Sequence, residues 1–492
     1  MTYFLGIDIG TSSVKVMLMN PEGSIEGIAR RGYDIRKEKL NYAEQDMEEL
    51  WEATKAALKE LTEQNPGIAN SIRGIGFSGQ MHGLVAVDRQ VHPLRPAIIW
   101  ADQRSESQIQ SIYKKISFQS YNAIIGNQLS VGFLIGSLLW MRENESDKFQ
   151  KIYKVLLPKD YIRYKLCGEL GTDASDASST GIFDIQKRDW AYELMEQLNI
   201  PAEYFVSCHE SCELAGYCTV KAAEETGLKT GTPMVYGGGD SLMMELGNGM
   251  IQSGILAATI GTASHLTCAM NQPIYDKQFR TNTWCHGNKD LWSIMGAHLS
   301  GGVALKWLMQ KVLETKSFEE MTEFAATVPV GSEGLIFLPY LSGERTPHHD
   351  PSAKAIYFGL TLKHTKAHII RAAMEGVVFS LKESYEIFKA LGIIPRKVIA
   401  AGGGAKSPVF LQIQADMFNQ EIYRTLGDEE ACMGAAIAAS VGTGYYTSYQ
   451  QACEHIVRFH EEVIHPIREN VECYQERFVT YKKLYQQNKE LF

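Results

Sequence analysis

The sequence predicts an α/β protein of two domains with a cleft between them. The chain has 492 residues, of which 45% are hydrophobic, and this exceeds what one core usually supports. Helix-like and strand-like patterns alternate along it. The pattern Ile-Gly-Thr-Ser-Ser at residues 9–13 also recurs half a chain later, as Ile-Gly-Thr-Ala-Ser at 260–264. We therefore expect two duplicated domains, residues 1–247 and 248–492.

The N-terminus predicts a β-hairpin. Apolar residues alternate over residues 3–8 and 14–18, and a turn of Gly, Thr and Ser separates the two runs. The second copy has the same form, with apolar runs at 255–258 and 266–268 around its turn. A second repeat pairs residues 235–240 with 398–404, because each runs from a strand into a glycine triplet.

Helices are predicted where apolar residues recur at steps of three and four. One covers residues 44–61, with Asp46 as N-cap and Glu49 completing a capping box. A second covers 364–388 and ends before Gly392. The charged tail, residues 447–492, has helical spacing and is expected to pack on the second domain.

Composition excludes several classes of protein. A net charge of -9 without a basic run disfavours a nucleic-acid partner or an anionic membrane surface. The N-terminus lacks a secretory signal pattern and residues 247–273 are too often polar to span a membrane, so we expect a cytoplasmic protein. Nine scattered cysteines indicate reduced thiols. The cluster at residues 208–218 does not have a familiar zinc spacing.

The two predicted turns suit phosphate groups. Small residues leave backbone N–H groups accessible at Gly10, Thr11 and Ser12, and again at Gly261 and Thr262. A single turn of this kind is more simply an ordinary hairpin, but two equivalent turns favour a grip on a polyphosphate. Asp8 precedes the first turn, where its carboxylate could hold Mg²⁺ directly or through water.

An acidic residue follows a glycine triplet at residues 237–240. We expect the glycines to let the backbone approach a ligand, and Asp240 to orient an attacking hydroxyl and accept its proton. An N-cap role for Asp240 is an alternative that does not exclude the first.

Two further clusters suggest ligand contacts. Residues 402–404 are Gly-Gly-Gly and precede Ser407 and a helical pattern, where a nucleotide could bind. A tight strand-to-helix turn without a ligand requires the same residues. Gln80, Met81 and His82 lie between glycines at a strand end. This cluster favours hydroxyl binding, whereas a lone histidine is more often structural.

Together these stretches resemble a known family. Residues 355–360 followed by 368–375 fit a C-terminal signature, and residues 338–347, 44–46 and 100–104 fit further family stretches. The chain resembles the FGGY carbohydrate kinases over residues 3–440. Within them residues 79–83, 157–161 and 172–178 are most similar to the subgroup that phosphorylates D-xylulose.

The resemblance implies two actin-like (ribonuclease-H-type) ATPase domains with ATP, Mg²⁺ and a ketose sugar in the cleft, and it suggests a homodimer. It implies that Asp240 is the catalytic base and that Asp8 serves the metal and phosphates. The substrate-binding residues that it implies are Gln80, Met81, His82, Trp100 and Asp102. The ATP-binding residues are Gly10, Thr11, Ser12, Lys15, Gly261, Thr262, Gly402, Gly403, Gly404 and Ser407.

Two departures from the family pattern leave alternatives open. Ser241–Glu245 replaces a segment that usually begins with Asn, and Ala263-Ser264 replaces Ser-Gly in the second turn. Both lie near the expected chemistry, so another ketose, a polyol or an aldonate (ribulose, glycerol or gluconate type) is an alternative substrate. An actin-like ATP-dependent binding protein is a more distant alternative, which the Gln80–His82 cluster disfavours.

Overall fold

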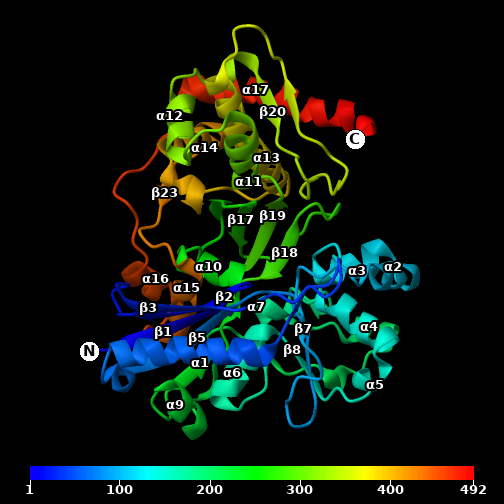
Figure 1. The fold of residues 1–492 in the computed structure, drawn as a ribbon, viewed down its shortest axis with the longest axis vertical. Coiled ribbons are helices and arrows are strands. Elements are labelled where there is room, and N and C mark those ends of the chain that lie inside the picture. The colour runs from blue at the N-terminus through cyan, green and yellow to red at the C-terminus, as the bar shows by residue number, and fades with distance from the viewer.

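The computed structural model describes residues 1–492 and has two bodies, one above the other in Figure 1. The lower body holds a sheet of order β13-β14-β5-β1-β2-β3, with β15 pairing to β5. Its strands are β1 (Tyr3–Ile9), β2 (Ser13–Met19), β3 (Ile25–Gly32), β5 (Ile72–Gly79), β13 (Leu214–Tyr217), β14 (Pro233–Val235) and β15 (Gly238–Gly239).

The upper body holds the second sheet, of order β18-β19-β17-β16-β22-β23. Its strands are β16 (Ile255–Ile260), β17 (Ser264–Met270), β18 (Asn282–Cys285), β19 (Trp292–His298), β22 (Lys397–Ala401) and β23 (Ile422–Arg424). The predicted α/β class with two domains is confirmed.

The two sheets share one topology. In each, the first strand of an antiparallel hairpin pairs in parallel with a later strand: β1 with β5, and β16 with β22. A third strand joins the hairpin, and a further parallel strand follows the later one. The predicted duplication of the hairpins is confirmed. The second predicted pairing is wrong, because β22 matches β5 and it is β14 that matches β23.

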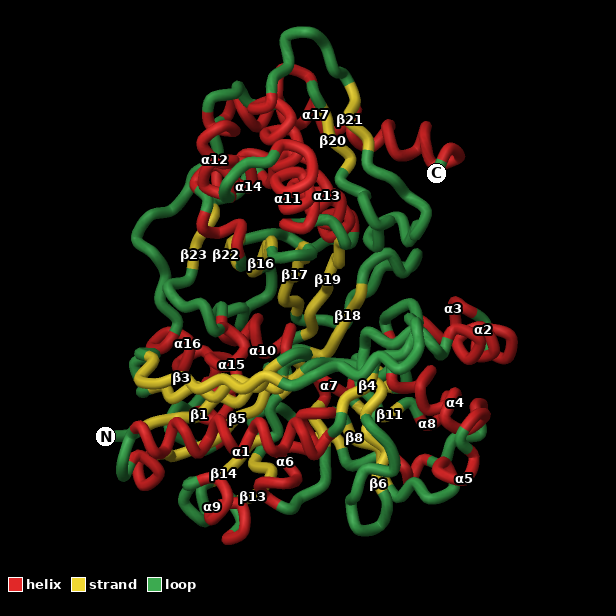
Figure 2. The backbone as a smooth tube through the Cα atoms, in the orientation of Figure 1, coloured by secondary structure: helices red, strands yellow, loops and turns green.

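Helices cover both sheets (Figure 2). In the lower body they are α1 (Met47–Gln64), α2 (Glu106–Lys115), α3 (Phe118–Ile125), α4 (Leu134–Asn144), α5 (Ser146–Phe149), α6 (Pro158–Cys167), α7 (Ala174–Ala177), α8 (Tyr192–Leu198), α9 (Val220–Thr226) and α10 (Asp240–Gly247). The later ones are α11 (Gly302–Trp307), α12 (Phe318–Ala326), α13 (Lys366–Ala390), α14 (Pro408–Phe418), α15 (Glu430–Gly442), α16 (Tyr449–Ile456) and α17 (Arg468–Asn488).

Short strand pairs complete the fold. They are β4 (Glu44–Gln45) with β7 (Ala97–Ile98), β6 (Val85–Val87) with β8 (Lys154–Leu156), β9 (Thr172–Asp173) with β12 (Cys208–His209), β10 (Phe183–Asp184) with β11 (Asp189–Trp190), and β20 (Ile336–Leu338) with β21 (Ile356–Phe358). The predicted helix at 44–61 begins later, at Met47. Asp46 caps it through the Glu48 N–H, while Glu49 pairs with Arg36 instead of closing a capping box.

The chain returns to the lower body after its second sheet. Helix α15 packs on β1 and β5, and α16 shares its apolar core (Figure 1). The approach is close, since a Cβ on Gly6 would lie 1.9 Å from the Cys432 carbonyl oxygen. A boundary near residue 248 therefore separates the two sheets but not the helices. Of the predicted tail, α17 packs on the upper body and α16 does not.

A membrane-crossing helix would need a longer apolar stretch than any helix of this fold provides.

Candidate active site

The strand ends of the lower sheet bring two carboxylates together. Asp8 lies opposite Ser78 on β5, and Ser78 lies opposite Gly238 on β15. The Ser78 hydroxyl donates to Asp8 Oδ1 at 2.8 Å. Asp240 follows β15 directly as the first residue of α10. The sheet register therefore places Asp8 and Asp240 at one edge.

Asp240 is half-buried and nearly unpartnered. Its carboxylate accepts hydrogen bonds only from Ser241, including one from the backbone N–H at 2.7 Å. Burial raises the pKa of Asp240 to about 7, and the neighbouring Asp8 carboxylate adds to the rise. The alternative N-cap role is not seen, because Gly239 is the N-cap and Asp240 bonds no N–H deeper in the helix.

The glycine triplet has a packing role that the sequence did not predict. A Cβ on Gly237 would lie 2.1 Å from the Phe77 carbonyl oxygen, and one on Gly238 2.5 Å from Ser175 Oγ. A Cβ on Gly239 would lie 2.8 Å from Met81 Cγ. These glycines therefore allow β15 to pack closely against protein atoms, directly before Asp240.

Asp8 suits a magnesium ion. Burial raises the pKa of its carboxyl group, and Ser78 is its only side-chain hydrogen-bond donor. Two adjacent carboxylates with little compensating charge favour a cation. No three His, Cys, Asp or Glu side chains gather to hold a metal alone, so the ion would also need water or phosphate oxygens.

Both hairpin turns form, and they differ in their surroundings. The first closes with the Gly10 N–H donating to the Ser13 carbonyl at 3.1 Å, and the second with Gly261 donating to Ala263 at 2.9 Å. The second turn also meets the start of α11, where the Gly302 N–H donates to the Gly261 carbonyl at 2.7 Å. A Cβ on Gly261 would find no atom closer than 3.7 Å, so this turn is open to a ligand.

Lys15, predicted to contact phosphates, already has a partner. Its Nζ lies 2.6 Å from Glu429 Oε2, just before α15. Burial alone would lower the pKa of Lys15, but this ion pair outweighs burial and raises it. Lys15 would have to exchange this carboxylate for a phosphate to serve as predicted.

A pocket of about 480 Å³ lies between the second hairpin and helices of the upper body. Five of the predicted ATP-binding residues line it: Gly261, Thr262, Gly403, Gly404 and Ser407. Gly402 does not, since it lines a separate cavity together with Ala400 and Ala401 of β22. The sequence analysis did not predict the walls from α11, α12 and α14, which are Gly302, Val303, Leu305, Lys306, Phe318, Glu319, Thr322 and Phe410.

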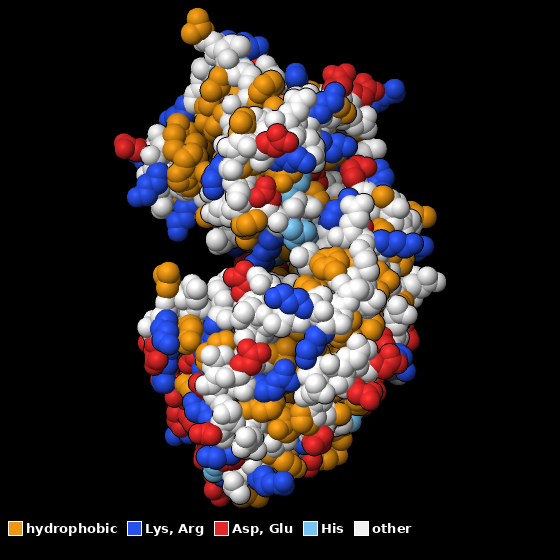
Figure 3. All heavy atoms as spheres, turned by 90° about the vertical axis from the view of Figure 1, so that its right-hand side faces the viewer, with side chains coloured by type: hydrophobic (Ala, Val, Ile, Leu, Met, Phe, Trp, Pro, Cys, Tyr) orange, Lys and Arg blue, Asp and Glu red, His pale blue; other side chains and the backbone are white.

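A second pocket, of about 320 Å³, lies where the two bodies meet. The lower body contributes His82, Trp100, Ala101, Gln103, residues 128–131 and Phe133. The upper body contributes residues to which the sequence assigned no sugar-binding role, although Arg345 and Thr346 lie in the family stretch 338–347: Asn282, Trp284, Ala297, Arg345, Thr346 and His349. Figure 3 shows the groove between the bodies, with histidine side chains at their junction.

His82 is rigidly held in this pocket. Its φ is 72°, its Nδ1 lies 2.6 Å from the Ser179 carbonyl oxygen, and its ring stacks on Phe133 with centroids 4.5 Å apart. Burial lowers its pKa to about 4, so the ring is neutral at pH 7. With Nδ1–H donating to the carbonyl, Nε2 can accept a hydrogen bond from a hydroxyl.

The other predicted sugar residues mostly support the pocket. Trp100 lines it and donates from Nε1 to Thr11 Oγ1 at 3.0 Å, which joins this pocket to the first turn. Gln80 is buried and donates to Gln45 Oε1 at 2.6 Å. Met81 is buried against Gly239. The structure does not bring Asp102 into the pocket, because its carboxylate is buried and bonded to Arg104 and the Ala43 N–H.

The two departures from the family pattern differ in where their residues lie. Ser241 directly follows Asp240 and donates to its carboxylate, whereas Glu245 and Ser264 do not line the sugar pocket. Glu245 is buried, accepts from Ser293 Oγ on β19 at 2.5 Å and lies 3.5 Å from His286 Nε2. Ser264 donates its hydroxyl to the Ser300 carbonyl. Glu245 and Ser264 therefore join parts of the protein and are not walls of the sugar pocket.

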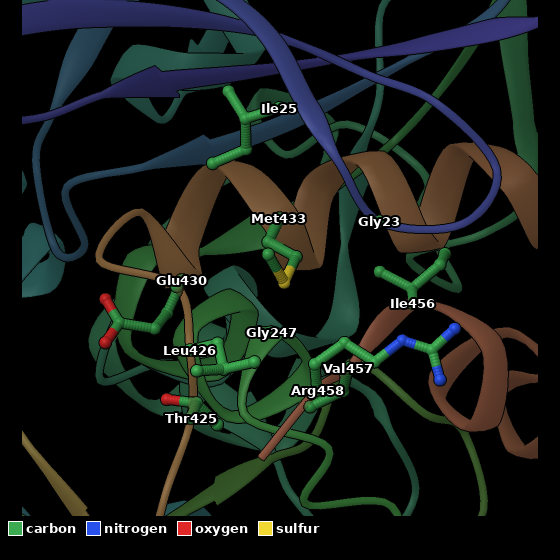
Figure 4. Close-up of a pocket in the computed structure, with 11 residues that line it drawn as sticks. Gly23, Ile25, Gly247, Thr425, Leu426, Glu430, Met433, Ile456, Val457 and Arg458 are labelled. Carbon is green, nitrogen blue, oxygen red and sulfur yellow. The ribbon is translucent and has the colours of Figure 1, made fainter. Parts of the chain in front are cut away.

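A third cavity, of about 240 Å³, lies beside α15 and is also lined by Gly23, Ile25 and residues 425–427 (Figure 4). Met433 lies at its centre, while Glu430 and Arg458 point away on opposite sides. Because it holds no converging polar groups, it lacks the features of a catalytic site.

Comparisons with known proteins agree with this geometry. The description "FGGY family of carbohydrate kinases, N-terminal domain" matches residues 3–247, and the C-terminal domain of that family matches 256–443. The chain is 35% identical to a xylulose kinase of Bacillus subtilis, covering 100% of this chain and 98% of the relative. It is 32% identical to a gluconokinase of the same organism, covering 92% and 90%. A ligand-bound xylulose kinase from Lactobacillus acidophilus superposes with a TM-score of 0.94 at 26% identity, covering 99% of each chain.

Proposed function

Since the chain belongs to the FGGY family of carbohydrate kinases and is a sugar kinase, we propose that it transfers the γ-phosphate of ATP to D-xylulose. The product would be D-xylulose 5-phosphate. The observation that carries the proposal is Asp240, whose half-buried carboxylate stands beside Asp8 while Gly239 packs against Met81, the neighbour of His82.

Asp240 has the properties of a general base. A base works best when its pKa lies near the working pH, and the pKa of Asp240 is about 7. Its carboxylate would orient the attacking hydroxyl and take its proton as the phosphorus–oxygen bond forms. The proton then stays on Asp240, and ADP leaves with the electron pair of the broken bond.

The two pockets divide the substrates between them. The pocket at the junction would hold the sugar through His82, Trp100 and Arg345, and the pocket of the upper body would hold ATP along Gly261 and Gly403. Asp8 would hold Mg²⁺ directly or through water. When bound, the ion offsets the negative charge of the phosphates.

D-Xylulose is favoured by the full-length relatives named xylulose kinase. One observation favours a second candidate, an aldonate such as gluconate. Arg345 lines the pocket without a carboxylate partner, and a guanidinium suits a carboxylate ligand. A gluconokinase is also among the relatives. The homodimer and the cytoplasmic location stay predictions.

A substrate panel tests the proposal. ADP release would be measured with MgATP and, under equal conditions, D-xylulose, L-xylulose, D-ribulose, L-ribulose, glycerol and gluconate. We expect the highest kcat/KM with D-xylulose. A higher value with gluconate would move the assignment to the second candidate, and no sugar-stimulated ADP release would contradict the proposed function for all of these substrates.

A further inference from the structure

One buried segment of the lower body touches several parts of the sugar site. It comprises residues 172–180, which run through β9 and α7, and we refer to it as the α7 segment. All nine of its residues are buried. Its first seven residues, 172–178, are one of the family stretches noted in the sequence, yet none of its residues lines the sugar pocket or the nucleotide pocket.

The first contact leads to the catalytic base. Ser175 Oγ accepts a hydrogen bond from the Gly239 N–H at 3.2 Å, and Gly239 directly precedes Asp240. The same hydroxyl donates to Asp173 Oδ2. Asp173 Oδ1 in turn lies 2.8 Å from Lys159 Nζ. A chain of polar contacts therefore runs from Lys159 through Asp173 and Ser175 to the backbone that carries Asp240.

The far end of this chain is fixed by buried charge. Lys159 Nζ also lies 2.7 Å from Asp160 and 3.5 Å from Asp176, and all four of these side chains are fully buried. Burial alone would lower the pKa of Lys159, but the three carboxylates raise it, so the lysine is charged. A buried ion must keep its partners, because losing one leaves an uncompensated charge. The cluster thus holds Asp173, and through it Ser175, in one position.

The second contact leads to the sugar-binding histidine. The His82 N–H donates to Ser179 Oγ at 3.2 Å, and His82 Nδ1 lies 2.6 Å from the Ser179 carbonyl oxygen. His82 has a left-handed backbone conformation, which is uncommon for a residue with a side chain. Ser179 therefore bonds both the backbone and the ring of a residue that needs outside support.

The third contact leads to the upper body. The Cys285 N–H, at the end of β18, donates to Ser178 Oγ at 3.1 Å. Asn282 and Trp284 of the same strand line the sugar pocket. The α7 segment thus contacts the strand that carries part of the opposite wall.

We propose that the α7 segment is the positioning element of the sugar site, with Ser175 setting the place of Asp240 and Ser179 that of His82. This inference rests on the proposed function, because it takes Asp240 as the base and His82 as a sugar contact. The two serines have different effects: Ser175 acts on the chemical step, and Ser179 acts on sugar binding.

The test compares three single variants in the full chain: Ser175→Ala, Ser179→Ala and, as a matched control, Thr180→Ala. Thr180 is equally buried, but its hydroxyl bonds only the neighbouring Ala177 carbonyl and Ile182 N–H. For each we would measure Tm, kcat, and KM for D-xylulose and MgATP.

Ser175→Ala should lower kcat about tenfold or more with the sugar KM within twofold, since small misplacements of a catalytic group are costly. Ser179→Ala should raise the sugar KM about two- to tenfold, the worth of one hydrogen bond, with the ATP KM unchanged. Thr180→Ala should change Tm but neither constant. The proposal is overturned if both serine variants match Thr180→Ala in kcat and KM.

A second variant keeps the test decisive if Ser175→Ala does not fold. Ser211 donates to the same Asp173 oxygen at 3.3 Å, and its carbonyl accepts from the Gly237 N–H. Ser211→Ala should also lower kcat with the sugar KM unchanged, and normal kcat would overturn the proposal. Asp240→Asn distinguishes failure of the proposed function from failure of the positioning proposal. If Asp240→Asn stays active, the assignment of Asp240 as the base is wrong. If Asp240→Asn is inactive but the serine variants have normal constants, only the positioning role is wrong.

Discussion

The nucleotide pocket and the sugar pocket are built in different ways. Every residue lining the nucleotide pocket comes from the second half of the chain, within residues 260–410. The sugar pocket draws on both halves, from His82 and Trp100 to Arg345 and His349. A pocket within one body can be complete by itself, whereas a pocket shared by two bodies depends on how they stand relative to each other. The sugar site is therefore the part that closure of the groove would change.

The difference also assigns roles to the two carboxylates. Asp8 and Asp240 both belong to the edge of the lower sheet, yet the nucleotide pocket belongs to the upper body. The reacting phosphate must therefore reach across the groove to the carboxylates. On this account, variants of the nucleotide pocket, the sugar pocket and the sheet edge should change three different kinetic constants.

The largest effect among these is expected at the sheet edge. Asp8→Asn should lower kcat by about 10²- to 10³-fold. The variant would hold Mg²⁺ less well, and the ion offsets the negative charge of the transferring phosphate. Ser78→Ala, which removes only the hydrogen bond to Asp8, is the milder companion and should cost less. Steady-state kinetics at saturating MgATP and sugar would measure both. A kcat for Asp8→Asn within threefold of wild type would mean that this edge does not serve the phosphates.

A smaller effect is expected from the walls of the sugar pocket. His82→Ala and Arg345→Ala remove one contact from each body, and each should raise the sugar KM about tenfold or more while leaving the ATP KM within twofold. Initial rates with varied sugar at fixed MgATP, and the reverse, give both constants. If only His82→Ala raises the sugar KM, only the lower body binds the sugar, and the sugar pocket no longer differs from the nucleotide pocket in being shared by two bodies.

The nucleotide pocket should respond in the opposite way. A Cβ on Gly403 would meet only the Ile260 carbonyl oxygen, at 3.8 Å, so Gly403→Ala should fold normally and narrow the pocket. We expect the ATP KM to rise about fivefold with the sugar KM unchanged, the worth of about 1 kcal/mol of binding energy. A Cβ on Gly404 would lie 2.8 Å from Ile260 Cβ, so Gly404→Ala should instead lower Tm. Equal ATP KM values for Gly403→Ala and wild type would contradict the placement of ATP.

The smallest effect concerns the contact between the bodies. Burial raises the pKa of Glu245 to about 8, while burial lowers that of its neighbour His286 to about 3. Folded protein thus holds a proton that an unfolded chain, with its ordinary glutamate pKa, releases at lower pH. Protonated Glu245 therefore contributes to the free energy of unfolding. This contribution is present in full below the unfolded pKa of the glutamate and is lost as pH rises toward 8.

Between pH 6 and pH 8 the free energy of unfolding should fall by roughly 2 kcal/mol because of Glu245. Glu245→Gln should remove this pH dependence, because glutamine does not titrate. Chemical denaturation of both proteins at several pH values measures it. The variant should gain on the wild type as pH rises, and parallel pH profiles would show that Glu245 titrates normally.

The sequence predicted the nucleotide pocket better than the sugar pocket. The turn at Gly261 and the strand-to-helix turn at Gly403 are each specified by adjacent residues, so local patterns identified them. Arg345, within the family stretch 338–347, and Asn282, on β18, reach the sugar pocket only through the packing of the upper body against the lower one, and no local pattern shows that. Asp102 shows the reverse case, because a polar residue in a family stretch proved to stabilise its own loop.

Packing also explains why two sequence patterns led to wrong predictions of the fold. Two glycine triplets looked equivalent in sequence, but Gly237–Gly239 fit β15 against Phe77 and Ser175, while Gly403 opens onto a pocket. The return of α15 to the lower sheet depends on Gly6 and Gly76, which lie far from it in the chain. Contacts of this kind are set by three-dimensional packing, which periodicity does not encode.

The central claim is that Asp240 is the base of a D-xylulose kinase, and Asp240→Asn tests it most directly. Sugar-dependent ADP release with MgATP would be measured beside D-xylulose binding by calorimetry, using wild type and variant. The account predicts that kcat falls by about 10²-fold or more, as loss of a general base does, while the Kd for D-xylulose stays within a few-fold of wild type. A kcat within about tenfold of wild type would contradict it.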